Sequence, residues 1–135
     1  MELTAFLNGK YIPISQCNIS VMDLGVVTGA SVTDFIRTFN HKIFRLEDHV
    51  DRFFKAAKNA YLEIPYTREE VYEISRKLID INAEMYPECE LGMCFYVTPG
   101  VNYTYAGSAV PAGGKLTPTY CQHVFPEPIY ASKPY

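Results

Sequence analysis

The sequence predicts an α+β domain in which two helices pack on one face of an antiparallel sheet. Strand-like segments occupy both ends of the chain, and two adjacent helical patterns lie between them. Each helical pattern has a single apolar stripe, which a sheet face would cover, and no strand–helix alternation indicates a doubly wound parallel sheet. The 135 residues, of which 48% are apolar and 20% charged, suit one globular domain.

The N-terminal part predicts two hairpins. Residues 3–14 hold two short apolar runs around Asn8-Gly9, a dipeptide that suits a tight turn because both turn positions need positive φ. Residues 32–39 are rich in β-forming side chains, Asn40-His41 can turn the chain, and residues 42–45 can return beside the first strand.

The segment between these hairpins, residues 19–29, is expected to be a shaped loop without a helix. It contains Gly25 and Gly29, four positions apart, and Asp23, whose carboxylate can bond to nearby backbone. We therefore expect Asp23 to shape the loop rather than to act as an acid or base.

The middle of the chain predicts two amphipathic helices. Thr67 and Glu70 form a capping box at the start of the second one, which Pro87 ends. The expected apolar stripe of the first helix is Leu46, Val50, Phe53, Phe54, Ala57 and Tyr61, and that of the second is Val71, Ile74, Leu78, Ile81 and Met85.

Strand patterns return in residues 92–98 and 119–125, separated by a loop over residues 99–118 that is rich in Gly, Pro and Tyr. Residues 126–135 look like a linker. We expect a domain over residues 1–125 and an interdomain linker over residues 126–135.

Composition excludes several classes of function. A net charge of −3 gives no basic stripe, so duplex nucleic acid and anionic membranes are not expected partners. No apolar run approaches the roughly 20 residues of a membrane span, and the N-terminus lacks a secretion pattern. The 4 cysteines form no C-x-x-C pair. Reduced thiols and a cytoplasmic location are expected.

Motifs for metal and nucleotide binding are missing from the sequence. The histidines His41, His49 and His123 are far apart, and neither H-E-x-x-H nor a phosphate-binding glycine motif occurs. No metal site is therefore predicted.

Arg52 admits two interpretations from the residues alone. Asp48, four positions earlier on the same helix, could pair with it on an exposed surface. Alternatively, its guanidinium could offer a planar fork of donors to a phosphate. His49 is expected to cap or pack at the start of the helix.

Three ordered strings decide between these interpretations by resemblance: FLNGK at 6–10, ISVMDLGVVTG at 19–29 and FRLEDHVDRF at 44–53. Together they resemble the small N-terminal domain of the class IV, fold-type IV pyridoxal-phosphate aminotransferases. That family includes branched-chain and D-amino-acid aminotransferases and aminodeoxychorismate lyase. The resemblance implies the small-domain fold of D-amino-acid aminotransferase-like proteins.

The resemblance also implies the site residues. Arg52, in the motif H-x-x-R, would hold the phosphate of pyridoxal phosphate, and Thr33, Arg37 and Tyr96 would line the substrate pocket. Alternation places Thr33, Phe35 and Arg37 on one strand face. Asp34 also stands where the family places a pocket side chain, and it departs from the Glu usual at that position.

The family's Schiff-base lysine has no counterpart among the lysines of this chain, because its motif lies in a second domain. No catalytic residue is therefore assigned here. The resemblance implies an N-terminal fragment of a homodimeric aminotransferase that uses an amino acid and a 2-oxo acid, and that is inactive alone. Two alternatives stay open: a freestanding binding or dimerisation module without catalysis, and a lyase of the same family.

Overall fold

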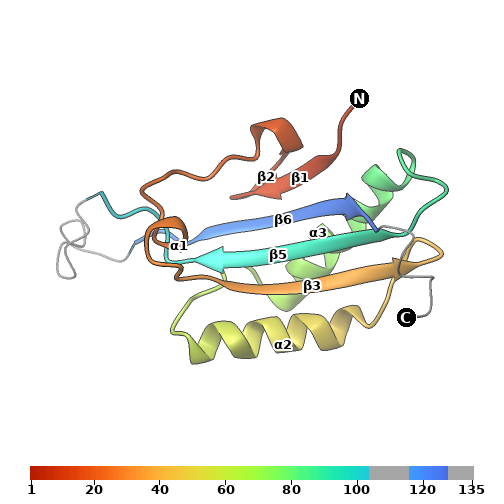
Figure 1. The fold of residues 1–135 in the computed structure, drawn as a ribbon. Coiled ribbons are helices and arrows are strands. Elements are labelled where there is room, and N and C mark those ends of the chain that lie inside the picture. The colour runs from red at the N-terminus through yellow and green to blue at the C-terminus, as the bar shows by residue number, and fades with distance from the viewer. Residues whose placement is uncertain (104–115, 128–135) are drawn as a thin grey trace, which may run out of the picture.

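The computed structural model describes residues 1–103 and 116–127. Its strands form one 6-stranded sheet in the order β2-β1-β6-β5-β3-β4, with every pair antiparallel. Figure 1 shows α2 running alongside β3 and α3 behind the central strands, and the predicted α+β fold is confirmed. The strands are β1 (Thr4–Leu7), β2 (Lys10–Pro13), β3 (Val32–Phe39), β4 (Lys42–Ile43), β5 (Leu91–Thr98) and β6 (Thr119–Pro126). The helices are α1 (Leu24–Val27), α2 (Leu46–Asn59) and α3 (Arg68–Ala83), with a 3-10 turn η1 (Ile14–Gln16).

Both predicted hairpins are confirmed. The turn between β1 and β2 places Asn8 at φ 47° and Gly9 at φ 91°, and the turn between β3 and β4 places Asn40 at 51° and His41 at 57°. All four residues therefore take the positive φ that a two-residue turn between twisted strands requires. Glu90 holds the second turn, since its carboxylate accepts bonds from the Asn40 and His41 amides at 2.6 and 3.1 Å.

The apolar stripe of α2 faces the sheet, as predicted, except at its last member. Leu46, Val50, Phe53 and Ala57 are buried. Tyr61 is 97% exposed, and its prediction as a core residue is wrong. The helix ends at Asn59, and Tyr61 takes a left-handed φ of 58° in the turn that follows, which aims its ring outward.

The capping box of α3 is confirmed, with the Thr67 hydroxyl accepting from the Glu70 amide at 3.1 Å. Its predicted stripe is wrong at Ile81, which is 40% exposed, and at Met85, which lies beyond the helix end. Buried positions at that end are instead Ile79 and Asn82. The Asn82 side chain ties α3 to β1 through the backbone of Thr4, at 2.8 and 2.9 Å.

The segment over residues 19–29 contains a helix that the sequence did not predict. α1 is a single turn of 4 residues, too short to leave an apolar period. Asp23 caps it by accepting from the Gly25 amide at 2.8 Å, and also accepts from the hydroxyls of Thr98 at 2.7 Å and Thr119 at 2.6 Å. The expectation that Asp23 shapes this segment is confirmed, because the buried carboxylate joins α1 to the ends of β5 and β6.

The two C-terminal strands are confirmed, and β6 continues one residue further than predicted, to Pro126. The expected loop over residues 99–118 is described except at 104–115, and the linker expected over 126–135 is described only at 126 and 127. The remaining parts of both predictions lie outside the described residues.

The two faces of the sheet differ in what covers them. The helix-covered face contributes Ile36, Phe95 and Tyr120 to the core, and the rings of Phe53 and Phe95 lie 4.8 Å apart. The opposite face, called here the open face, presents alternate residues such as Thr33, which is exposed, and Tyr96, which is half-buried. Within the described part of the chain, no helix has the length and apolar character that crossing a membrane requires.

Candidate functional site

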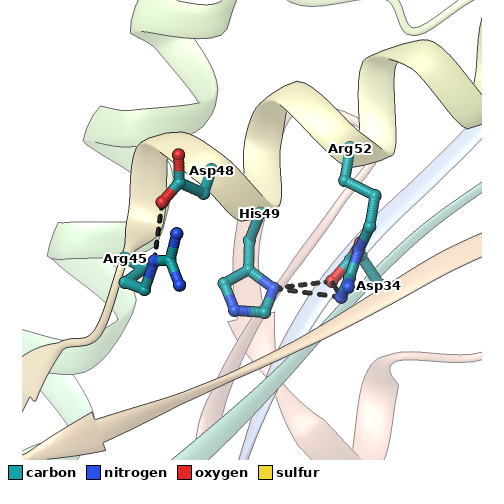
Figure 2. Close-up of polar contacts among 5 residues, drawn as sticks. All are labelled: Asp34, Arg45, Asp48, His49 and Arg52. Atoms are coloured by element: carbon teal, nitrogen blue, oxygen red, sulfur yellow. Dashed lines mark hydrogen bonds and ion pairs between the residues drawn. The ribbon is translucent and has the colours of Figure 1, made fainter.

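Arg52 belongs to a cluster of charged side chains between α2 and β3, the strand that α2 runs alongside (Figure 2). Its Nε donates to Asp34 Oδ2 at 2.7 Å and its Nη2 donates to Asp34 Oδ1 at 2.8 Å. His49 Nδ1 lies 2.9 Å from the same Oδ1 and 3.3 Å from Arg52 Nη2. One carboxylate therefore fixes both the guanidinium and the imidazole.

Burial and charge determine how this cluster titrates. The Asp34 side chain is 4% exposed, whereas that of Arg52 is 67% exposed. Burial raises the pKa of Asp34, but the hydrogen bonds and charges of Arg52 and His49 outweigh burial, so the pKa lies below its ordinary value. The bond to Asp34 raises the pKa of Arg52. Both groups stay charged at neutral pH, and the bidentate geometry is retained.

Asp48 takes no part in this cluster. It pairs with Arg45 Nε at 2.7 Å, and both of these side chains are mostly exposed (Figure 2). The interpretation of Arg52 as the surface partner of Asp48 is therefore wrong. The expectation that His49 caps or packs at the start of the helix did not include its partner Asp34. That residue lies 15 positions earlier, on β3, where helix spacing does not reveal it.

The guanidinium of Arg52 retains donors for a further acceptor. Arginine has five N–H donors in a fixed plane, and Asp34 engages only the edge formed by Nε and Nη2. Among the described residues, none accepts a hydrogen bond from Nη1. A mostly exposed cationic fork with a braced orientation suits the oxygens of a phosphate monoester. In the same part of the chain, no three His, Cys, Asp or Glu side chains gather in a way that could hold a metal ion.

The predicted pocket residues lie on the open face, and the structure brings two of the three together. Thr33 and Tyr96 are register partners on β3 and β5. Arg37 lies four positions after Thr33 on β3 and pairs with Gly92 of β5. At 3.3 Å per residue, Arg37 is therefore about 13 Å from Thr33. Its Nε donates to the Thr38 carbonyl at 3.2 Å.

Asp34 is the site residue whose role sequence reasoning missed. The expectation that it lines the substrate pocket with Thr33 and Arg37 is wrong, because its buried side chain points to the helix-covered face and bonds to Arg52. Strand alternation carried the signal, because Asp34 lies between Thr33 and Phe35, which were placed on the opposite face. The cluster around Arg52 and the pair formed by Thr33 and Tyr96 thus lie on opposite sides of one strand.

A braced guanidinium on a helix beside an antiparallel sheet defines a domain suited to binding a phosphorylated molecule. Residues 31–130 match the family model described as amino-transferase class IV. The chain belongs to the class IV aminotransferase family.

Relatives of known name support the assignment. Over 77 residues the chain is 39% identical to a D-alanine aminotransferase of Staphylococcus aureus and 32% identical to a putative branched-chain-amino-acid aminotransferase of Methanocaldococcus jannaschii. Each alignment covers 57% of this chain and 27% of the relative. The matched part of the chain therefore spans about a quarter of the length of each of these relatives.

Solved structures show the same fold. The branched-chain aminotransferase of the archaeon Thermoproteus uzoniensis, solved with norvaline, superimposes with a TM-score of 0.74 at 19% identity, covering 96% of this chain and 42% of that one. The Escherichia coli branched-chain amino acid aminotransferase also gives 0.74, at 21% identity, covering 94% and 42%. The T.th. branched-chain amino acid aminotransferase with pyridoxamine 5'-phosphate gives 0.76 at 22% identity, covering 98% and 42%.

Proposed function

We propose that the protein containing this chain is a pyridoxal-phosphate-dependent aminotransferase that moves an amino group between an amino acid and a 2-oxo acid. The observation that carries the proposal is the bidentate bond between Asp34 and Arg52, which leaves Nη1 of an exposed guanidinium for a phosphate. Membership of the class IV family and the pyridoxamine 5'-phosphate of a structural relative support this choice of ligand.

Arg52 binds the cofactor phosphate in this proposal, and Asp34 and His49 act as positioning residues. Because Asp34 is buried and ionised, it holds the guanidinium plane in one orientation before the phosphate arrives, which lowers the entropic cost of binding. When bound, pyridoxal phosphate supplies the electron sink for reactions at the carbon that bears the amino group.

Thr33, Tyr96 and Arg37 line the substrate pocket from the open face in the same proposal. Burial raises the pKa of Tyr96, so its hydroxyl stays protonated near neutral pH and can donate a hydrogen bond. β3 lies between this pocket wall and the phosphate anchor, because Thr33 and Asp34 are neighbours on that strand and point to opposite faces of the sheet. Arg37 is about 13 Å from Thr33 along the strand and meets a more distant part of the substrate.

The proposal includes a Schiff-base lysine outside residues 1–135, a homodimer and a cytoplasmic location. It also places a domain over residues 1–125 and a linker over residues 126–135. The lysines exposed on the surface of the described chain are Lys10, Lys42, Lys55, Lys58 and Lys77. The two other lysines, Lys115 and Lys133, lie outside the described residues.

Calorimetric titration with pyridoxamine 5'-phosphate tests the phosphate anchor. This ligand has an amine in place of the aldehyde, so it does not react with surface lysines. Arg52→Ala should weaken binding by about ten- to a hundredfold, the range expected for losing a charge-assisted hydrogen bond. Arg45→Ala is the matched control, because Arg45 is a similarly exposed arginine near the start of the same helix that pairs with Asp48 instead.

Pyridoxamine without the phosphate separates the phosphate contact from the rest of the site. It should bind the parent chain and Arg52→Ala with equal affinity. If Arg45→Ala and Arg52→Ala weaken the binding of pyridoxamine 5'-phosphate equally, the loss comes from surface charge in general. That result would contradict the assignment of Arg52 as the phosphate-binding residue.

A further inference from the structure

Two cysteines from distant parts of the sequence meet on the open face of the sheet. Cys17 Sγ and Cys121 Sγ lie 3.6 Å apart, although 104 positions separate the residues. Both are free thiols. A disulfide needs about 2.05 Å between the sulfurs, so the two sulfurs are about 1.6 Å short of bonding distance in the reduced chain.

The fold holds the Cys17 side of this pair in place. Cys17 follows the turn η1, where its amide bonds to the Ile14 carbonyl at 3.0 Å, and the Ile14 amide bonds to the Leu3 carbonyl next to β1 at 2.8 Å. Glu2 fastens the same turn, because its carboxylate accepts from the amide and hydroxyl of Ser15 at 2.9 and 2.8 Å. The contact between the sulfurs is therefore a consequence of the strand pairing and the turn.

Cys121 lies inside the sheet, between Leu7 of β1 and Tyr96 of β5. It is 1% exposed, whereas Cys17 is partly exposed. An oxidant in solution therefore reaches Cys17 first and finds Cys121 directly behind it. This combination of one accessible thiol and one adjacent resolving thiol is typical of reversible thiol oxidation.

We propose that Cys17 and Cys121 form a reversible thiol oxidation site, at which hydrogen peroxide converts the two thiols into an intramolecular disulfide. This inference concerns the thiols alone and does not depend on the proposed aminotransferase activity. Its ligand is a small hydroperoxide, and its product is a covalent link between the turn η1 and the central strand β6.

The reaction balances in two steps. The Cys17 thiolate attacks one peroxide oxygen, the S–O bond forms as the O–O bond breaks, and the departing hydroxide takes a proton and leaves as water. Cys121 sulfur then attacks the Cys17 sulfur, the S–S bond forms as the S–O bond breaks, and the hydroxide leaves as water with the Cys121 proton. The thiols lose two electrons in total, and one peroxide is reduced to two waters.

Burial supports this order of events. Burial raises the pKa of Cys121 to about 12, and the neighbouring Cys17 adds to this rise. The Cys121 thiol therefore stays protonated at neutral pH, and it acts as the second, resolving partner rather than as the first nucleophile. Tyr96 is the register partner of Cys121 on β5, so disulfide formation also changes the surroundings of the Tyr96 side chain.

Peroxide treatment of the whole folded chain tests the proposal. Titration of thiols after unfolding should count four before treatment and two after it, and a thiol reductant should restore all four. Peptide mapping without reduction should find the peptides containing Cys17 and Cys121 joined. Cys17→Ser should keep its remaining thiols free under the same dose, and Cys94→Ser should still form the link.

A second measurement separates native geometry from random oxidation. In an unfolded chain the short loop between Cys89 and Cys94 closes more readily than a loop that spans 104 positions. Oxidation in urea should therefore favour a disulfide between Cys89 and Cys94 over one between Cys17 and Cys121. A link between Cys17 and Cys121 that needs the native fold supports the proposal. Native oxidation that joins Cys94 or Cys89 instead, that links separate chains, or that leaves Cys17 as a sulfinic acid would overturn it.

Discussion

Replacing Asp23 with alanine should destabilise the chain more than any other single change to an acidic residue of the described part. The carboxylate is 0% exposed and accepts three hydrogen bonds, from the Gly25 amide and the hydroxyls of Thr98 and Thr119. These bonds join the single-turn helix α1 to the ends of β5 and β6. Alanine would remove every one of these acceptors.

The magnitude follows from the groups left behind. The residues that carry these hydroxyls, Thr98 and Thr119, are themselves buried, at 3% and 6% exposure. Leaving a buried donor without an acceptor costs about 1–3 kcal/mol, and losing a helix cap costs about 1 kcal/mol. Allowing for relaxation of the hydroxyls, we expect Asp23→Ala to lower the free energy of unfolding by about 3–5 kcal/mol. Such a loss is a large fraction of the roughly 5–15 kcal/mol that is typical of a domain.

Urea unfolding followed by circular dichroism measures this loss. The urea concentration at the midpoint should fall by about 2 M if the free energy of unfolding depends on urea with the slope typical of a small domain. Asp23→Asn keeps one acceptor oxygen and should lose about 1–2 kcal/mol. Asp48→Ala is the control, because the Asp48 side chain is 62% exposed and its loss should cost no more than about 1 kcal/mol. An Asp23→Ala variant within about 1 kcal/mol of the parent would refute this reasoning.

Two further predictions concern Asp34 and the glycines. The pKa of Asp34 is lowered in the folded chain, so its contribution is present above the unfolded pKa of about 3.9 and is lost as pH falls through the folded pKa. Asp34→Asn should therefore flatten the acid limb of stability below about pH 4, measured by urea unfolding across pH. Gly100→Ala should destabilise strongly, since φ is 97° and a Cβ would overlap the Thr117 carbonyl. Gly29→Ala, at φ 70° with open space around it, should cost only about 1–2 kcal/mol.

Different results would contradict these two predictions. A variant lacking Asp34 that loses stability on acidification as steeply as the parent would show that this carboxyl is not a source of the acid dependence. Equal losses for Gly100→Ala and Gly29→Ala would show that backbone strain alone, and not the close approach of Thr117, determines the cost.

Local chemistry made much of this fold predictable from the sequence. The turn at Asn8-Gly9 and the capping box of Thr67 and Glu70 each depend on residues within a few positions of one another. Periodicity failed at Tyr61 and Ile81, near the helix ends, because an apolar spacing does not reveal where a helix stops or how it is rotated against the sheet.

The candidate site was less predictable, because its contacts join distant segments. Arg52 was identified through its motif, but its partner Asp34 lies 18 positions away, and the nearby Asp48 misled the pairing. The contact between Cys17 and Cys121 spans 104 positions and has no local signature. Such pairs are set by strand order and register, which a single sequence specifies only through the assembled fold.

The central claim is that Arg52, braced by Asp34, binds the phosphate of a pyridoxal-type cofactor. A crystal structure of the chain with pyridoxamine 5'-phosphate tests it most directly. We expect phosphate oxygens about 2.7–2.9 Å from the outward nitrogens of Arg52, with the bonds to Asp34 retained. A phosphate held elsewhere, such as in the groove lined by Lys55, Lys58 and Arg68, with no contact to Arg52, would contradict the claim.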